Sequence, residues 1–355
     1  MTRPVRVGIA GLGRSGWGMH AGALSVLNEQ YEVSAVTDPD PERRREAEER
    51  FSCSSAEDFT TLLSADTELI VVASPSHLHA EHTVAALEAG KHVIVEKPMA
   101  QSTDEADRMM AAARDAERTL TVNQNYRYKP TFRKVKAIID SGILGQTLQV
   151  RVAVHQFSRR WDWQTLKAYN GGILANHGAH VVDWALGLFE DEDPELFSFL
   201  TTTPLYAGDA DSHAKLIINP KDGPLLDVEL THSNAYAQPY WLVMGTRGSL
   251  SGSHTSLRWS YFDPAAAPPL ELDTSPTPDR SYNSEKLPMT EETVSFTSTP
   301  NEDMLLLYRD LFATLRNGAP VVITPESVRR QMRLFERIRE TAAARGGDAL
   351  TQRPR

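Results

Sequence analysis

Residues 5–16 read VRVGIAGLGRSG, and this stretch decides the fold of the first part of the chain. The apolar run from Val5 to Ala10 predicts a buried strand, and the residues from about Ser15 to Leu27 predict a helix. Three glycines between them fit the pattern G-x-G-x-x-G, namely Gly11, Gly13 and Gly16. Such glycines let the backbone approach a pyrophosphate, which then lies on the N–H groups at the start of the helix. Alone the pattern is weak, but its place between strand and helix indicates a dinucleotide-binding turn.

An acidic residue follows at the distance that this turn requires. A second strand is predicted from Tyr31 to Thr37, and it is followed by Asp38. A carboxylate at the end of the second strand accepts hydrogen bonds from ribose hydroxyls and repels the 2′-phosphate of NADP. The sequence therefore favours NAD, while Arg14 and the basic run 43–45 keep NADP as the less favoured alternative. A glycine turn that only shapes the fold is the remaining interpretation.

The rest of the first 125 residues alternates between short apolar runs and helical patterns, which is typical of β-α units on a parallel sheet. Further strands are predicted at residues 69–73, 92–95 and 120–122, and helices at 78–89 and 103–118. We therefore expect residues 1–125 to form an α/β, NAD-binding Rossmann domain.

The pattern changes after residue 125, where Leu148, Val150, Val152 and Val154 alternate with more polar residues. A period of two predicts a strand with one buried face. More strands are predicted at 214–218, 226–230, 240–244 and 257–262, and helices at 176–188, 302–316 and 325–344. Residues 264–300 are rich in Pro, Ser and Thr and predict a long surface loop. Residues 126–355 are expected to form an α+β domain for substrate binding and oligomerisation, whose final helices pack back on the first domain.

Composition narrows the class of protein. The 355 residues carry a formal net charge of −10 and one cysteine, Cys53. An acidic chain disfavours nucleic acid and anionic membranes as partners, because both require a concentrated basic surface. No apolar run is long enough to cross a bilayer or to act as a signal peptide. A lone thiol fits a reducing compartment, so we expect a cytoplasmic protein without disulfides.

Glu96-Lys97-Pro98 follows a predicted buried strand, at the edge where open α/β sheets bind ligands. One interpretation of Lys97 is a surface residue or an ion pair with Glu96. The other is a lysine whose proton affinity is lowered by desolvation and by a nearby positive nicotinamide. The chemistry of these residues alone leaves both open.

Six segments distributed along almost the whole chain decide between these interpretations. They are SPSHLH at 74–79, AGKHVIVEKP at 89–98, NYRY at 125–128, SGILG at 141–145, GGILANHGAHVVD at 171–183 and NGAP at 317–320. In this order they resemble the Gfo/Idh/MocA family, the group of glucose–fructose oxidoreductase and inositol dehydrogenase.

The resemblance implies that Lys97 is the catalytic lysine, that its bond to Pro98 is cis, and that Glu96 lies near the nicotinamide ribose. It implies a second domain with a large, open, mostly antiparallel sheet whose exposed face builds homodimers or homotetramers. The expected cofactor-binding residues are Gly11, Gly13, Arg14, Ser15, Gly16, Asp38, Ser74, Pro75, His79, Glu96, Lys97 and Asn125.

Asn176 and His180 are four residues apart and share one face of the predicted helix. The resemblance places this face over the nicotinamide, with His180 at the substrate hydroxyl. The family's usual aspartate is replaced by Asn176, and an amide can orient a partner but cannot raise a histidine pKa as a carboxylate does. We therefore expect Lys97 to be the main acid/base and His180 to assist it. A histidine that caps the helix or lies in the core is the alternative for His180.

Aromatic faces and guanidinium groups suit hydroxylated rings. The expected substrate-binding residues are Arg127, Arg159, Trp163, Tyr169, Asn176, His177 and His180. No metal is expected, because His177 and His180 lack an evident third ligand. The group His77, His79 and His82 is interpreted as part of the cofactor wall or a helix surface.

These observations predict an NAD-dependent dehydrogenase that transfers hydride between NAD and a secondary alcohol of a sugar, glycoside or cyclitol. The asparagine at position 176 also resembles members that act on larger sugars or glycosides. Two alternatives remain, an NAD-dependent redox-assisted glycosidase and a non-catalytic nucleotide-binding sensor.

Overall fold

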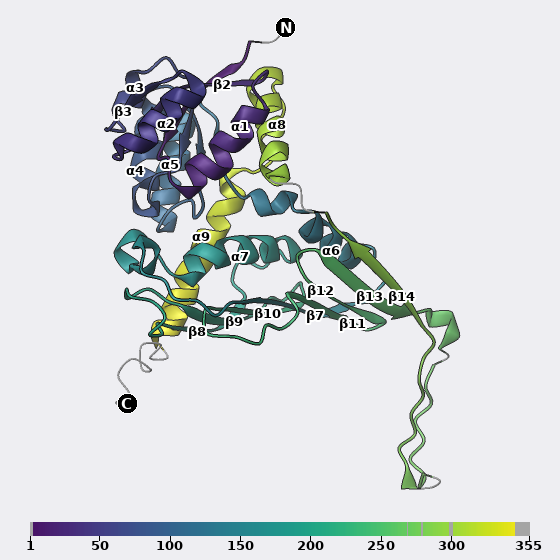
Figure 1. Cartoon of the computed structure of the whole chain (residues 1–355). Coiled ribbons are helices and arrows are strands. Elements are labelled where there is room, and N and C mark those ends of the chain that lie inside the picture. Colours follow the sequence, from purple (N-terminus) through teal and green to yellow (C-terminus); the bar gives the residue numbers. More distant parts are fainter. Residues whose placement is uncertain (1–2, 268, 278–279, 298–300, 345–355) are drawn as a thin grey trace.

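The computed structural model describes residues 3–267, 269–277, 280–297 and 301–344, which form two domains, each built on one sheet (Figure 1). The first sheet has six parallel strands in the order β3-β2-β1-β4-β5-β6. Their bounds are β1 Val5–Ala10, β2 Tyr31–Thr37, β3 Ser54–Ala56, β4 Leu69–Val72, β5 His92–Val95 and β6 Leu120–Val122. The order reverses direction between β1 and β4, so the carboxyl ends of these strands open onto a crevice suited to a dinucleotide.

Helices connect these strands and cover both faces of the sheet, so β4 is buried throughout and β1 is buried except at Arg6. They are η1 Arg14–Ala21, α1 Gly22–Val26, α2 Pro41–Phe51, α3 Thr61–Ser64, η2 Ser76–Leu78, α4 His79–Glu88 and α5 Thr103–Asp115. Two more helices, η3 Asn125–Tyr128 and α6 Pro130–Asp140, follow β6 and lead to the second sheet. The helix expected from Ser15 to Leu27 begins as a π-helix, η1, and continues as α1. The basic run 43–45 lies on α2, where Arg45 is paired with Glu42 and Glu49.

The second sheet has eight strands in the order β14-β13-β12-β11-β7-β10-β9-β8. All neighbours are antiparallel except β7 and β10, which run parallel. The strands are β7 Thr147–His155, β8 Glu195–Thr201, β9 His213–Asn219, β10 Leu225–Thr231, β11 Trp241–Gly245, β12 Gly248–Gly252, β13 Ser256–Phe262 and β14 Met289–Ser295. The expected fold class, a Rossmann domain followed by a large, mostly antiparallel sheet, is confirmed.

One face of the second sheet is covered by helices that come from several parts of the chain (Figure 1). Trp241 of β11 packs against Phe132 of α6 and Trp184 of α7, with ring centroids 4.9 and 4.6 Å apart. The remaining helical elements are η4 Trp163–Thr165, η5 Lys167–Tyr169, η6 Leu174–Gly178, α7 Ala179–Ala185, η7 Leu186–Leu188, η8 Pro264–Ala266, α8 Glu302–Asn317 and α9 Pro325–Ala344.

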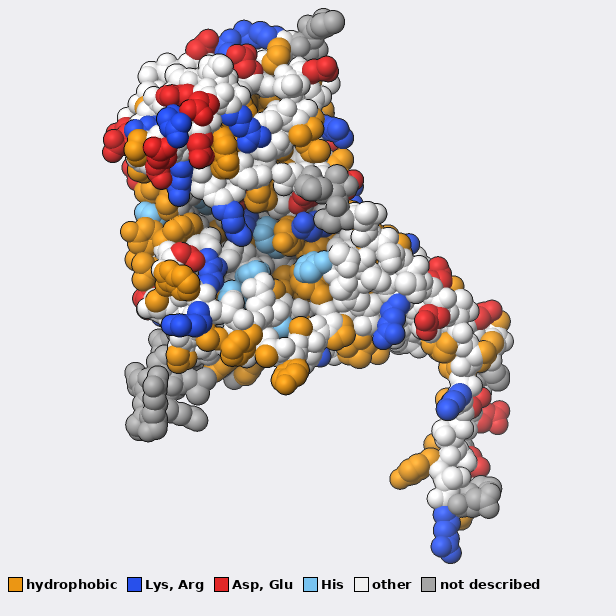
Figure 2. Space-filling model, viewed as in Figure 1, with side chains coloured by type: hydrophobic (Ala, Val, Ile, Leu, Met, Phe, Trp, Pro, Cys, Tyr) orange, Lys and Arg blue, Asp and Glu red, His pale blue; other side chains and the backbone are white. Residues whose placement is uncertain are grey.

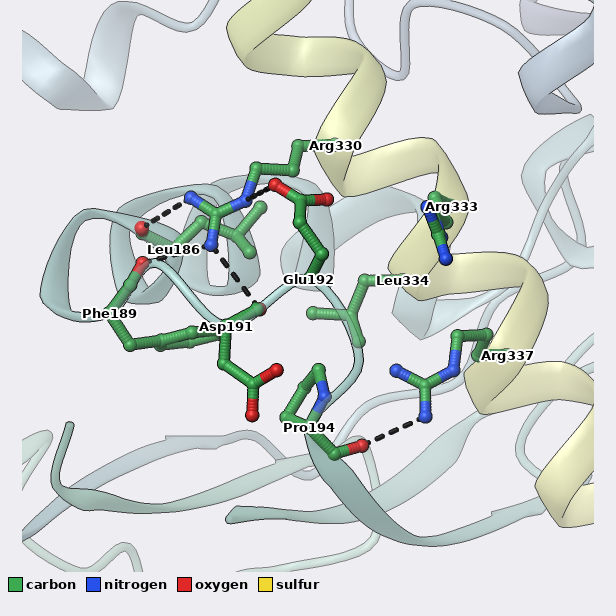
Figure 3. Close-up of a pocket in the computed structure, with 9 residues that line it drawn as sticks. All are labelled: Leu186, Phe189, Asp191, Glu192, Pro194, Arg330, Arg333, Leu334 and Arg337. Atoms are coloured by element: carbon green, nitrogen blue, oxygen red, sulfur yellow. Dashed lines mark hydrogen bonds and ion pairs between the residues drawn. The ribbon is translucent and has the colours of Figure 1, made fainter. Parts of the chain in front are cut away.

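Helix α9 joins the two domains. Its Arg329 pairs with Asp107 of α5, while its Ile338 carbonyl accepts a hydrogen bond from Ser198 of β8 at 2.7 Å. Farther along, Arg330 and Arg337 bind backbone carbonyls of the 186–194 segment and pair with Glu192 and Asp193, around a small pocket (Figure 3). Because Arg330 and Arg337 are already bound by carboxylates and carbonyls, these contacts fix α9 against the 186–194 segment.

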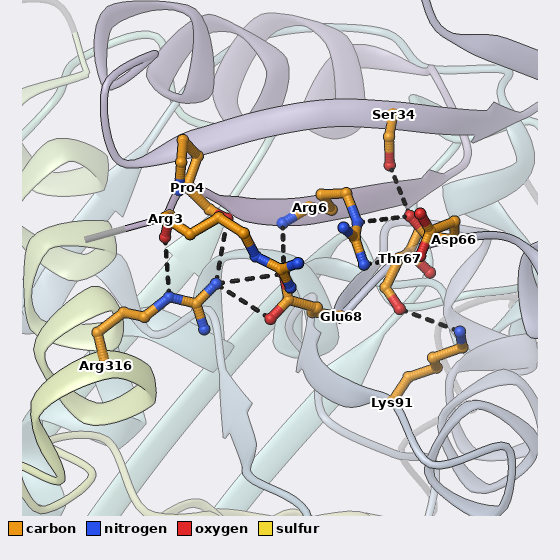
Figure 4. A network of polar contacts seen from close by, with 9 residues as sticks. All are labelled: Arg3, Pro4, Arg6, Ser34, Asp66, Thr67, Glu68, Lys91 and Arg316. Atoms are coloured by element: carbon orange, nitrogen blue, oxygen red, sulfur yellow. Dashed lines mark hydrogen bonds and ion pairs between the residues drawn. The ribbon is translucent and has the colours of Figure 1, made fainter. Parts of the chain in front are cut away.

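Helix α8 also packs on the first domain. Its Arg316 reaches the carbonyls of Arg3 and Pro4 and pairs with Glu68 at 3.0 Å, within a polar network at the amino end of β1 (Figure 4). The last part of the chain thus contacts both sheets, while the boundary at residue 125 stays a prediction.

The prediction of a long surface loop at 264–300 is wrong for part of the segment. The described residues between β13 and β14 extend away from the body of the sheet and are largely exposed (Figure 1). Met289–Ser295, however, forms the edge strand β14, paired with β13. Residues 268, 278–279 and 298–300 of that prediction lie outside the described residues. In the described part of the chain, no helix is long and apolar enough to span a bilayer.

Candidate active site

Two glycines of the turn, Gly11 and Gly16, pack closely against backbone atoms, whereas the third, Gly13, has open space beside its Cα. Gly11 has φ +92°, and a Cβ there would meet the Ala73 carbonyl oxygen at 2.6 Å. A Cβ on Gly16 would lie 1.8 Å from the Gly11 oxygen, so both glycines are required by the turn itself. A Cβ on Gly13 would meet nothing within 4 Å. Gly13 therefore faces the space that a pyrophosphate would fill at the start of η1.

Asp38 lies after β2 at the other side of this turn. Its Oδ2 accepts a hydrogen bond from the Leu12 N–H at 2.7 Å and its Oδ1 accepts one from the Asp40 N–H at 2.9 Å. Arg43 Nη1 lies 3.6 Å from Oδ2. Each carboxylate oxygen keeps a lone pair for a ribose hydroxyl, because each accepts only one of these backbone bonds.

The Glu96 side chain is buried at the carboxyl end of β5. Its Oε1 accepts hydrogen bonds from Ser15, from His20 Nε2 at 2.9 Å and from Asn123 Nδ2 at 2.7 Å, and the Lys97 N–H donates to Oε2 at 3.1 Å. Burial alone would raise the pKa of Glu96, but the bond from His20 and the nearby charges hold that pKa well below its usual range. Glu96 is therefore ionised and fixed in place.

Lys97 follows Glu96, and its bond to Pro98 is cis, as expected. Its Nζ donates to the Asn176 side-chain oxygen at 3.0 Å and to the Asn176 carbonyl at 3.1 Å. Burial lowers the pKa of Lys97 to about 8, against the opposing effect of Glu96. An amide partner adds no negative charge, so it holds the ammonium or amine without restoring its usual basicity.

Two histidines lie on the same helix as Asn176. The His180 ring stacks on Tyr126 with centroids 3.7 Å apart, and its Nδ1 is buried without a hydrogen-bond partner in the described residues. Burial, followed by the charge of Lys97, lowers the pKa of His180 well below its usual value, and the same causes lower that of His177 to about 3. Both rings are neutral at physiological pH. Figure 2 shows histidine side chains gathered in the hollow between the two domains.

Other residues predicted for the cofactor lie along the same edge. Ser74 Oγ and Asn125 Oδ1 are buried without partners in the described residues, so both could bind a cofactor hydroxyl or amide. His79 is 1% exposed, and its two ring nitrogens lie 2.8 and 3.0 Å from the carbonyls of Pro98 and Ser74. This places His79 behind the wall of the site, where it ties the end of β4 to the segment after β5.

The residues predicted for the substrate divide into two groups. Trp163 and Tyr169 are partly exposed, with ring centroids 6.4 Å apart, and Tyr169 meets His77 of η2 edge-on at 4.5 Å. They link the two domains beside the site. Arg159 is exposed, whereas the guanidinium of Arg127 is held by both oxygens of Asp183 at 2.6 and 2.7 Å and by Ser327. Most N–H donors of the Arg127 guanidinium are therefore already bound within the protein.

Sequence reasoning missed two of the residues that hold Glu96, His20 and Asn123. His20 is fully buried on the inner face of η1, and its Nδ1 lies 2.7 Å from the hydroxyl of Tyr308 in α8. Asn123 follows β6. No local pattern could have found them, because their partners are distant in sequence. Among the described residues, no group of three or more His, Cys, Asp or Glu side chains is placed to hold a metal ion.

Two family models match the chain, one for each domain. The model described as an oxidoreductase family with an NAD-binding Rossmann fold matches residues 5–124, and the GFO/IDH/MocA C-terminal domain matches residues 132–251. Together they include the glycine turn, Glu96, Lys97 and the helix of Asn176 and His180.

Curated proteins are similar to this chain over half of its length or more. The chain is 32% identical over 188 residues to the NADP-dependent scyllo-inositol 2-dehydrogenase of Bacillus subtilis, a match that covers 52% of each protein. It is 30% identical over 263 residues to an uncharacterized oxidoreductase of Schizosaccharomyces pombe, with 69% of each covered. The chain thus spans about half the length of the first relative and over two thirds of the second.

A solved structure of levoglucosan dehydrogenase in complex with NADH and levoglucosan matches the whole fold. Its TM-score is 0.79 at 24% identity, with 96% of this chain and 98% of that chain covered. This likeness shows a common arrangement of both domains. With both family models and the relative that matches over two thirds of its length, the chain belongs to the Gfo/Idh/MocA family of oxidoreductases with an NAD-binding Rossmann domain.

Proposed function

We propose that the protein is an NAD-dependent dehydrogenase that oxidises a secondary alcohol of a sugar, glycoside or cyclitol, with Lys97 as the main acid/base and His180 assisting. The observation that carries this proposal is the Lys97 side chain, whose pKa is about 8 and whose Nζ is held 3.0 Å from the amide oxygen of Asn176. A group with a pKa near the working pH is suited to both taking and giving a proton.

The residues of the chain account for the proton and for the position of the alcohol. Bound NAD supplies the acceptor for the hydride. Lys97 Nζ in its neutral form takes the hydroxyl proton, and in its charged form returns it in the reverse direction. The neutral ring of His180 can accept or donate one hydrogen bond, so it holds the hydroxyl without competing for its proton.

NAD is favoured over NADP because of Asp38. Its buried carboxylate would accept hydrogen bonds from the adenosine ribose and repel a 2′-phosphate. Arg43 and Arg44 do not reverse this preference, because Arg43 already lies 3.6 Å from Asp38 and Arg44 donates to the Asp38 carbonyl at 2.7 Å.

The substrate class is proposed from the site and from relatives. The names of two relatives contain scyllo-inositol and levoglucosan, both polyhydroxylated rings. Trp163 and Tyr169 offer exposed aromatic faces beside the site, which suit the apolar face of such a ring.

The test is NADH formation, followed by absorbance, with inositols, free aldoses and glucosides, and with NAD and NADP in parallel. The proposal predicts a signal with NAD for at least one ring polyol. Glycoside cleavage without accumulating NADH would favour the redox-assisted glycosidase, and NAD binding without turnover would favour the sensor.

We also propose a homo-oligomer built on the uncovered face of the eight-stranded sheet. Side chains on that face include Phe197, Ile217 and Leu242, interspersed with the charged cluster of Lys215 and Asp227. Light scattering of the purified protein distinguishes a monomer from a dimer or a tetramer.

A further inference from the structure

Two π-helices meet at Glu96 and Lys97, the proposed catalytic lysine. In the described chain, η1 supplies Ser15 and His20, which both bind Glu96, and η6 supplies Asn176, which binds Lys97. Ser15 and His20 are five residues apart, and an α-helix with about 3.6 residues per turn would place them on different faces. A π-helix, whose hydrogen bonds run from i to i+5, brings them onto one face. The unusual helix thus has a specific consequence, two donors on one carboxylate oxygen.

His20 has a defined hydrogen-bonding state in this position. The ionised Glu96 carboxylate only accepts, so the proton that joins the two must lie on His20 Nε2. On the other side, His20 Nδ1 is 2.7 Å from the Tyr308 hydroxyl. Burial raises the pKa of Tyr308 well above its usual value, so the phenol keeps its proton and can donate it to Nδ1. The Tyr308 carbonyl in turn accepts from the Tyr31 hydroxyl at 2.7 Å, which anchors the far end.

The bonds to Glu96 are divided between its two oxygens. Ser15, His20 and Asn123 all donate to Oε1, whereas among the described residues Oε2 accepts only the Lys97 N–H, at 3.1 Å. The three hydrogen bonds to Oε1 therefore fix the carboxylate and prevent it from rotating freely toward Lys97 Nζ. That orientation matters because the Glu96 charge raises the proton affinity of Lys97, against burial and the positive charges of Arg14 and Arg160.

We propose that His20 is a positioning residue for the catalytic lysine: by fixing the Glu96 carboxylate from the nucleotide-binding helix, it keeps that carboxylate away from Lys97 Nζ and leaves Nζ to Asn176. The proposal rests on the role of Lys97 given above. Because Ser15 and His20 both lie on η1, directly after the glycine turn, the same helix that binds the pyrophosphate sets the surroundings of the proton-transfer group.

The other groups that face Glu96 and Lys97 are neutral or positively charged. Lys97 is faced by Asn176, by the neutral rings of His177 and His180, and by the charges of Arg14 and Arg160. Glu96 is faced by the uncharged Ser15 and Asn123 besides His20. Glu96 is thus the main negative charge near Lys97. The hydrogen bond from His20 helps to set the position of its carboxylate.

The experiment compares His20→Leu, His20→Gln and Tyr308→Phe. Without a donor at position 20, Ser15 and Asn123 alone hold Oε1, and we expect the loosened Glu96 carboxylate to turn toward Lys97 Nζ. The pH midpoint of alcohol oxidation then rises by about one unit, as expected for a closer opposite charge. At pH 7.5 that shift lowers kcat about eightfold, because a smaller fraction of Lys97 is neutral. His20→Gln, which keeps an N–H donor, restores the wild-type midpoint. Tyr308→Phe, which leaves the bond between His20 and Glu96, gives a smaller shift than His20→Leu.

The control is His92→Leu at the start of β5, a partly buried histidine whose ring accepts a hydrogen bond from the Thr119 N–H. A purely structural role predicts that both leucine variants lower the melting temperature and leave the pH midpoint unchanged. A folded His20→Leu protein with the wild-type midpoint would overturn the proposal.

A second measurement does not depend on turnover. Labelling of Lys97 with acetic anhydride at a series of pH values, read by mass spectrometry, gives its proton affinity directly. We expect labelling of Lys97 to require a higher pH in His20→Leu than in the wild type and in His20→Gln. The same labelling curve in all three overturns the role of His20, whereas a shifted curve without any sugar oxidation contradicts only the proposed function.

Discussion

The Nζ of Lys97 lies 3.0 Å from Oδ1 of Asn176, so the amine of the proposed base is held by a neutral amide from the other domain. This contact explains how a departure from the family's usual aspartate is compatible with proton transfer. A carboxylate at this position would stabilise the ammonium form. The amide keeps Nζ in place, while burial holds the pKa of Lys97 at about 8.

Replacing Asn176 with Asp tests this relationship. Oxidation requires neutral Lys97, so its rate rises with pH and levels off above the pKa of Lys97, while reduction shows the opposite trend. A carboxylate at 3 Å raises that pKa, and we expect the midpoint of kcat/KM for oxidation to move upward by about one to two units. The measurement is the pH profile in both directions. A profile unchanged between wild type and Asn176→Asp would show that Lys97 is not the group that titrates.

Gly13 and Gly16 form a matched pair for the cofactor site. In Gly13→Ala the new Cβ meets no protein atom within 4 Å, so stability is retained, but the methyl group occupies the space of the pyrophosphate. We expect the Kd for NADH to rise about tenfold or more, a loss of about 1.4 kcal/mol. In Gly16→Ala the Cβ would lie 1.8 Å from the Gly11 oxygen, so the free energy of unfolding falls by about 3 kcal/mol.

Fluorescence titration with NADH and urea unfolding separate the two effects. Normal NADH affinity in Gly13→Ala would mean that the cofactor does not lie against this turn. Equal loss of stability in both variants would mean that Gly13 is needed by the fold alone.

Asp38→Asn tests the preference for NAD. The amide can still accept the Leu12 N–H bond, but the negative charge and one acceptor for the ribose are lost. We expect the KM for NAD to rise about tenfold, since a hydrogen bond to a charged group contributes about 1.5–3 kcal/mol, and the KM for NADP to fall. Glu46→Gln, on the exposed surface of α2, removes the same charge away from the turn and serves as the control. An unchanged ratio of NAD to NADP use in Asp38→Asn contradicts the assignment.

Much of the fold could be predicted because its buried elements have a strong hydrophobic pattern. Strands β2, β5 and β6 and helix α9 have the predicted bounds. Strand β14 was missed because Met289–Ser295 is an edge strand that is almost fully exposed, so no apolar alternation marks it. The π-helices could not be predicted, because a single extra residue per turn leaves no trace in the composition.

The site residues, too, could be predicted only in part from the sequence. The positions of Gly11, Asp38 and Lys97 could be predicted because each follows a strand, whereas the catalytic role of Lys97 was implied by the family resemblance and stays a proposal. His20 could not, since it binds Glu96 and Tyr308, which are 76 and 288 residues away. Arg127 was predicted from residue type alone, and the structure shows its guanidinium held by Asp183.

The most direct test of the account is NADH formation by the wild-type protein and by Lys97→Met with the best substrate of the polyol panel. We predict that the wild type reduces NAD, and that Lys97→Met loses about 10²–10⁴-fold in kcat, the usual contribution of a positioned acid or base, while its Kd for NADH changes little. Full activity in Lys97→Met would contradict the central claim that Lys97 transfers the proton.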